Sequence, residues 1–194
     1  MSTTLTYFPD IPRSHGLKTD ETPKPIETAL TRGDGLDLDI IELFFFAYRD
    51  FTADADKILE RYGFGRAHHR VLYFVNRKPG MTVAELLDVL KITKQSLARV
   101  LKQLIDSGHI VQVRGPRDRR QRELYPTTKG RELALALATP QSRRIARALE
   151  ESGIGERAAI ERFLEAMVNP DQRPQIEALR SEEHTSELQS LAYL

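Results

Sequence analysis

The sequence contains no cysteine among its 194 residues. Disulfides, thiolate metal sites and cysteine-based redox sensing are therefore excluded, and the composition suits a reducing cytoplasm. The most apolar segment, Ile40 to Tyr48, is far shorter than the roughly 20 residues that cross a bilayer. Met1 to Asp10 shows no basic start followed by an apolar run, so no secretory signal is expected. We predict a cytoplasmic protein with no membrane partner.

Motifs that support catalysis or metal binding are also missing. No P-loop, nucleophile elbow or zinc motif occurs. The only close pair of histidines, His68 and His69, is adjacent in sequence, and adjacent residues of a helix point about 100° apart, too far to bind one ion from one face. Gly63-Phe64-Gly65 resembles part of a dinucleotide fingerprint but lacks the third glycine. We therefore predict no enzyme, no metal and no cofactor.

Acidic residues are scarce in one stretch of the chain. From Lys91 to Arg131 there are eleven Lys or Arg and three Asp or Glu, a net charge of +8, whereas the whole chain has +1. Residues 1–60 carry six basic and twelve acidic side chains, and residues 132–194 carry seven and eleven. A basic stretch between acidic flanks is expected of a sequence-specific nucleic-acid binder. A solvated charged surface is the alternative.

The chain before this basic stretch divides into an arm and a helix. Residues 1–37 contain four prolines among polar residues without periodicity, which predicts a flexible arm. A helix is predicted over 38–62, with Asp37 or Asp39 as its cap. Its apolar side chains occupy more than one side, which favours burial by a second subunit over a simple intrachain core. These side chains are Leu43, Phe44, Phe46, Phe51, Ile58 and Leu59.

Helical spacing then continues in three shorter segments. A helix is predicted over 66–77 and another over 83–90, the latter beginning with a capping box of Thr82 and Glu85 and with Met81 packed on Leu86. A further helix is expected to begin after Thr93 as its N-cap and to end before Gly108. Apolar residues at i, i+3, i+4 and i+7 give it one core face: Leu97, Val100, Leu101, Leu104 and Ile105. Two short helices joined by a brief turn match helix-turn-helix geometry.

The outward side chains of this last helix suit DNA recognition. Arg99 can donate to guanine O6 and N7, Gln95 can pair with adenine N6 and N7, and Ser96 can do either. Lys94 and Lys102 are expected to contact phosphates, which position the helix without reading sequence.

A β-hairpin with an arginine-rich tip is predicted after Gly108. Residues 109–114 alternate as a half-buried strand, with Ile110 or Val111 and Val113 inward, and Leu124 lies on the returning strand. The tip between them carries Arg117, Arg119 and Arg120 together with Asp118. Clustered arginines at a tip favour an external polyanion, and a narrow A·T-rich minor groove accepts inserted arginines. Asp118 is expected to orient Arg120 through an ion pair.

Residues 83–133 resemble the MarR family of dimeric winged-helix transcription regulators. The resemblance rests on Asp118-Arg119-Arg120 followed by Thr127 and Gly130, although Pro126 stands where the family commonly has leucine. Residues 63–80 and 90–108 are similar to the PetP-like branch of that family. The resemblance implies that Arg120 enters the minor groove, oriented by Asp118.

The resemblance also implies a homodimer on a palindromic operator. Helices are predicted at about 129–149, capped by Thr127 or Thr128, and at about 156–168. With the helix over 38–62, residues 131–179 would form the dimerisation region around the DNA-binding domain, residues 63–130. The string from Arg180 to Ser190 coincides with a translated sequencing adapter, so we interpret residues 180–194 as a non-native tail.

A small-molecule effector is a further partner to consider. His68 or His69 either lines an effector pocket or lies at the surface, and the surface is favoured. Tyr48, Tyr73 and Arg70 are pocket residues or, preferably, core or rim residues.

The sequence thus predicts a mainly α fold with a small β-hairpin wing, in which a winged helix-turn-helix domain is flanked by dimerisation helices. The predicted function is sequence-specific DNA-binding regulation of transcription. The alternative is a winged-helix protein-interaction module without an operator, but that would present an apolar or acidic recognition face.

Overall fold

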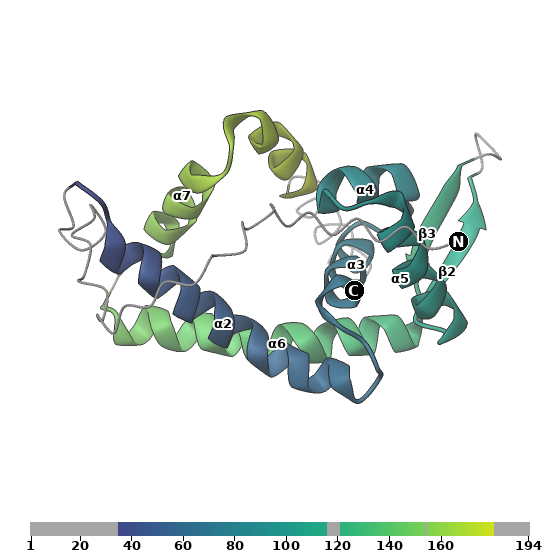
Figure 1. The fold of residues 1–194 in the computed structure, drawn as a ribbon, viewed down its shortest axis with the longest axis horizontal. Coiled ribbons are helices and arrows are strands. Elements are labelled where there is room, and N and C mark those ends of the chain that lie inside the picture. The colour runs from purple at the N-terminus through teal and green to yellow at the C-terminus, as the bar shows by residue number, and fades with distance from the viewer. Residues whose placement is uncertain (1–34, 116–120, 154, 181–194) are drawn as a thin grey trace, which may run out of the picture. The chain divides into compact units, whose positions relative to one another are not determined.

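The computed structural model describes residues 35–115, 121–153 and 155–180, and their fold is mainly helical with a small antiparallel sheet (Figure 1). The chain divides after Glu42, and the part from Leu43 onward contains the sheet and the core. Most of the predicted arm, residues 1–37, and the tail beyond Arg180 lie outside the described residues. The predicted fold class is confirmed.

The first two described helices begin where the sequence places them. Helix α2 spans Leu38–Glu60, so it ends two residues before the predicted boundary at Tyr62. Helix α3 spans Arg66–Arg77, as predicted, and buries Val71, Leu72 and Val75. It packs beside α4, α5, α6 and strand β3 and therefore forms the centre of the domain.

The helix-turn-helix consists of α4, Val83–Leu90, and α5, Lys94–Asp106. The predicted capping box is confirmed: the Glu85 backbone N–H donates to Thr82 Oγ1 at 3.2 Å, and the Thr82 N–H donates to Glu85 Oε2 at 2.7 Å. Thr93 caps α5 through the Ser96 N–H at 3.1 Å. Local side-chain chemistry thus fixes both helix starts. Between them Lys91 adopts a left-handed conformation, with φ of 50°.

The sheet contains a strand that sequence reasoning missed. Strand β1, Met81–Thr82, pairs with β3, Arg122–Pro126, which pairs in turn with β2, Ile110–Arg114. Met81 lies opposite Leu124 and both are buried. Met81 thus contributes a ladder position, in addition to the apolar contact predicted for it.

The predicted half-buried alternation of β2 is wrong beyond its first residue. Ile110 is buried, but Val111 and Val113 are 45% and 47% exposed. Strand β2 is an edge strand and only its base reaches the core, so the rest of the hairpin has no layer to cover it.

Helical segments complete the described chain. Helix α6 spans Thr128–Glu151, capped by Thr127 Oγ1, which accepts from the Gly130 N–H at 3.0 Å, and α7 spans Arg157–Met167. A short 3-10 turn, Pro170–Gln172, leads into helical residues 173–180.

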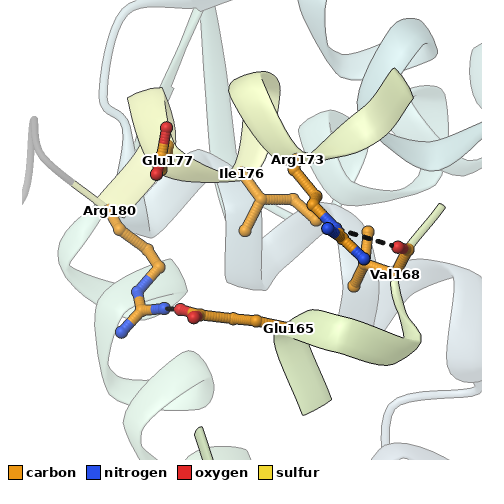
Figure 2. A pocket seen from close by; sticks show the side chains of 6 residues that line it. All are labelled: Glu165, Val168, Arg173, Ile176, Glu177 and Arg180. Atoms are coloured by element: carbon orange, nitrogen blue, oxygen red, sulfur yellow. Dashed lines mark hydrogen bonds and ion pairs between the residues drawn. The ribbon is translucent and has the colours of Figure 1, made fainter. Parts of the chain in front are cut away.

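The turn after α7 is held by arginine side chains. Figure 2 shows Arg173 directed at the Val168 carbonyl, with a distance of 3.2 Å, and Arg180 paired with Glu165. They surround a cavity of about 80 Å³, which is too small for more than a few waters.

Candidate nucleic-acid interface

Helix α5 separates a core face from an outward polar face. Leu97, Val100, Leu101 and Leu104 are buried on the inner side. The five predicted contact residues lie on this helix, and all but Ser96 are exposed, Ser96 being half-buried: Lys94, Gln95, Ser96, Arg99 and Lys102. The structure therefore presents amide and cationic groups together on the outward side of α5, the helix labelled in Figure 1.

The contact residues differ in how free their polar groups are. Within the described residues, the side chains of Lys94, Gln95 and Arg99 have no hydrogen-bond or ion-pair partner. Lys102 pairs with Asp106 one turn later, at 2.5 Å, and such an exposed pair is weak enough for a phosphate to replace it. The Ser96 hydroxyl accepts from Thr93 Oγ1 at 3.0 Å and keeps its own proton to donate. Of the three predicted base-reading residues, Arg99 and Gln95 are thus the ones whose side-chain polar groups are unpaired within the described residues.

A buried histidine of α3 is hydrogen-bonded to α5. The Gly65 N–H donates to His68 Nδ1 at 3.1 Å, so Nε2 carries the proton and donates to Gln103 Oε1 of α5 at 2.7 Å. The ring stacks on Phe64 with centroids 4.6 Å apart. The favoured surface position for His68 is therefore wrong: the residue is 8% exposed and connects α3 to α5.

The wing places two further cations beside the predicted ones. Arg114 and Arg122 face each other across the β2–β3 ladder and both are exposed. The hairpin closes beyond them through Gly115 N–H to the Gln121 carbonyl, at 3.1 Å. Sequence reasoning overlooked this pair, although the strand register brings the two arginines together. The tip residues Arg117, Asp118, Arg119 and Arg120 lie outside the described residues, and their contacts stay predictions.

His109 supports the base of the wing from inside the core. It is 1% exposed, its Nδ1 lies 2.9 Å from Ser107 Oγ, and its Nε2 has no partner among the described residues. The Ser107 hydroxyl donates to the Gln103 carbonyl at 2.6 Å, which leaves its oxygen to accept from the ring. Burial, and then repulsion by Lys129, lower the pKa of His109.

A pH dependence of stability follows. The pKa of an unfolded histidine is about 6.5, and the folded pKa of His109 is lower, so the unfolded chain binds this proton first as the pH falls. The stabilisation is present above about pH 6.5 and is lost toward the folded pKa, by up to about 1.4 kcal/mol per pH unit. Urea unfolding of wild type and His109→Phe from about pH 7.5 to about pH 5 measures it. Equal slopes for both proteins would contradict the role of His109.

A separate cavity of about 360 Å³ lies among α2, α3 and α6. Arg66 Nη2 and Nε donate to Asp56 Oδ2 at 2.8 and 3.0 Å across it. Burial lowers the pKa of His69 more than Asp56 raises it. His69 is half-buried and lines the cavity together with Tyr48, Tyr73 and Arg70. The remaining lining residues are Phe51, Thr52, Asp56, Arg66, Phe74 and Gln141.

A capped helix pair, an exposed cationic second helix and a three-stranded wing define a winged helix-turn-helix protein. A profile of the MarR family matches residues 62–121. The chain is also 46% identical over 143 residues to the HTH-type transcriptional regulator PetP of Rhodobacter capsulatus, which covers 74% of this chain and 86% of PetP. The chain therefore belongs to the MarR family of transcription regulators.

Solved structures agree at the level of the fold. A crystal structure of MarR shares 21% identity over 76% of this chain and 94% of its own, with a TM-score of 0.51. A SlyA-like transcription regulator from Listeria monocytogenes shares 17% identity over 75% and 93%, with a TM-score of 0.53. Among the described residues, no helix is both long and apolar enough to cross a membrane.

Proposed function

We propose that this chain regulates transcription by binding operator DNA sequence-specifically, with α5 in the major groove. The observation that carries the proposal is the exposed face of α5, where Gln95 and Arg99 are unpaired within the described residues while the opposite face is fixed in the core. Both side chains have the donor geometry that reads purine edges. A protein-interaction module would instead need an apolar or acidic face here.

The wing supplies the second part of the proposed interface. Arg114 and Arg122 lie at the ends of strands that lead to the arginine-rich tip. In the proposal these two side chains contact phosphates, and Arg120 enters the adjacent minor groove with Asp118 orienting it. Residues 63–130 thus form the DNA-binding domain.

Exposed apolar side chains outside that domain support a homodimer. On α2, Leu43, Phe45 and Phe46 are 65%, 70% and 46% exposed, and on α7 Leu164 and Met167 are 50% and 57% exposed. Apolar groups gathered on helices are expected to be covered by a partner. We assign residues 38–62 and 131–179 to dimerisation, and a two-fold dimer requires a palindromic operator.

The cavity among α2, α3 and α6 supports control by a small-molecule effector. It combines aromatic rings with a few polar groups, as ligand sites do, and its volume of about 360 Å³ suits a small organic molecule. Effector binding would change DNA affinity only if the free and DNA-bound geometries bind the effector differently.

Salt titration tests whether the basic face binds phosphates. With about four phosphate contacts per protomer, from Lys94, Lys102, Arg114 and Arg122, log Kd is expected to change with log salt concentration with a slope of about 7 for a dimer. Fluorescence anisotropy with a labelled duplex measures it, with Lys94→Ala as a variant that removes one contact per protomer and lowers the slope. A slope near zero, or an unchanged slope for the variant, would contradict the proposed interface.

A further inference from the structure

Arg70 belongs to the cavity and to the helix-turn-helix at once. It projects from α3 and lines the cavity of about 360 Å³. Its Nη2 donates to the carbonyl oxygen of Leu90 at 2.9 Å. Leu90 is the last residue of α4, the first helix of the helix-turn-helix. One side chain therefore connects the wall of the cavity to the point where that helix ends.

The carbonyl that Arg70 contacts lies at a sensitive position. The last carbonyls of a helix lack intrahelical donors, and a cation there is favourable. Lys91 follows with φ of 50°, its N–H donating to the Leu87 carbonyl at 3.0 Å, and Thr93 then caps α5. The residues between Leu90 and Thr93 set where the recognition helix begins. A loss of the Arg70 contact would loosen this turn.

Arg66, the second arginine that lines the cavity, has a different kind of hydrogen-bond acceptor from Arg70. Arg66 lies one turn earlier on α3, and its guanidinium makes a two-nitrogen contact with the Asp56 carboxylate of α2. The charge of Arg66 is thereby balanced, whereas Arg70 donates to a neutral carbonyl. Carboxylates accept stronger hydrogen bonds from guanidinium than carbonyls do. An acidic group that enters the cavity is therefore expected to attract Arg70.

We infer that Arg70 is the positioning residue through which the cavity controls the turn between α4 and α5. An acidic group bound in the cavity and the Leu90 carbonyl compete for the same guanidinium, so occupancy of the cavity releases the turn that positions the recognition helix. This inference rests on the proposed effector cavity and is independent of any operator sequence. His68 joins α3 to Gln103 of α5 through a hydrogen bond that does not involve Arg70.

Amide hydrogen exchange followed by NMR on the full chain tests the inference without DNA. Benzoate is the probe, and benzamide is its neutral control of similar shape. Benzoate is expected to speed exchange of the Lys91 amide about two- to tenfold, whereas benzamide leaves it unchanged. Arg70→Met should exchange as fast without any ligand and respond no further. Arg66→Met without ligand should exchange like wild type, because Arg66 does not contact α4.

Three results would overturn the inference, and they separate its failure from that of the proposed function. Benzoate that shifts the His69 ring resonances without changing Lys91 exchange would leave the cavity real and the role of Arg70 wrong. Benzoate that changes neither would reject the effector cavity as well. Wild-type exchange in Arg70→Met would also overturn the inference. Arg70→Lys retains a cationic donor and should keep part of the protection, which distinguishes loss of this contact from loss of folding.

Discussion

Replacing Gly130 by alanine is expected to lower the free energy of unfolding by about 3 kcal/mol. Gly130 is buried in the first turn of α6, and a Cβ there would lie 2.0 Å from the His109 carbonyl oxygen. That oxygen also accepts from the Thr127 N–H at 3.1 Å and from Thr127 Oγ1 at 3.2 Å, so two hydrogen bonds hold it in place. Neither backbone can give way cheaply, and α6 would have to move off the base of the wing.

Urea denaturation monitored by circular dichroism measures this effect. The matched control is Gly155→Ala, where no atom of the described residues lies within 4 Å of the added methyl group. The control is expected to stay within about 0.5 kcal/mol of wild type. A similar stability for both variants would show that α6 and the wing are not packed as closely as described. For a chain of this size the Gly130 variant should also melt roughly 6–12 °C lower.

Replacing Arg99 by alanine is expected to weaken operator binding by about 1–3 kcal/mol and to relax the preference at one base pair. The guanidinium is exposed on α5 and unpaired within the described residues, so its donors are free for a guanine edge. Lys102→Ala is the matched comparison from the same helix. Because Lys102 is already paired with Asp106 and is assigned to a phosphate, its loss should weaken all sequences by a smaller, uniform amount.

Titration of each variant against the operator and against single-base substitutions of it measures both effects. An Arg99→Ala protein that loses affinity equally for every sequence would show that Arg99 contacts phosphates. A Lys102→Ala protein that alters preference at one position would reverse the two assignments.

The helix boundaries were predictable because their causes are local. Three helices begin at a threonine whose Oγ1 accepts from the backbone N–H three residues later: Thr82, Thr93 and Thr127. Such a cap can be recognised within four residues of sequence. Strand β1 was not predictable in this way. Its two residues pair with Leu124 and Glu123, about forty positions away. A strand of two residues is too short to show the alternation of apolar and polar side chains by which strands are recognised in a sequence.

The candidate site shows the same division. Amphipathic spacing was sufficient to place the predicted contact residues on the outward side of α5, where all are exposed except the half-buried Ser96. The cavity brings together residues from Tyr48 to Gln141, on three helices, and such proximity depends on packing. The same holds for His68, whose Nε2 donates to Gln103, thirty-five residues later in the chain. The interpretation as a surface histidine failed because a sequence does not show what covers a residue.

Selection of bound duplexes from a random DNA pool tests the central proposal most directly. A homodimer with one α5 per half-site is expected to enrich a palindrome whose half-site centres lie about 10 base pairs apart. Arg99→Ala in the same selection should lose information at one symmetric pair of positions. Enrichment of no sequence, with only weak salt-sensitive binding, or of a single unrepeated half-site, would contradict a dimeric operator-binding regulator.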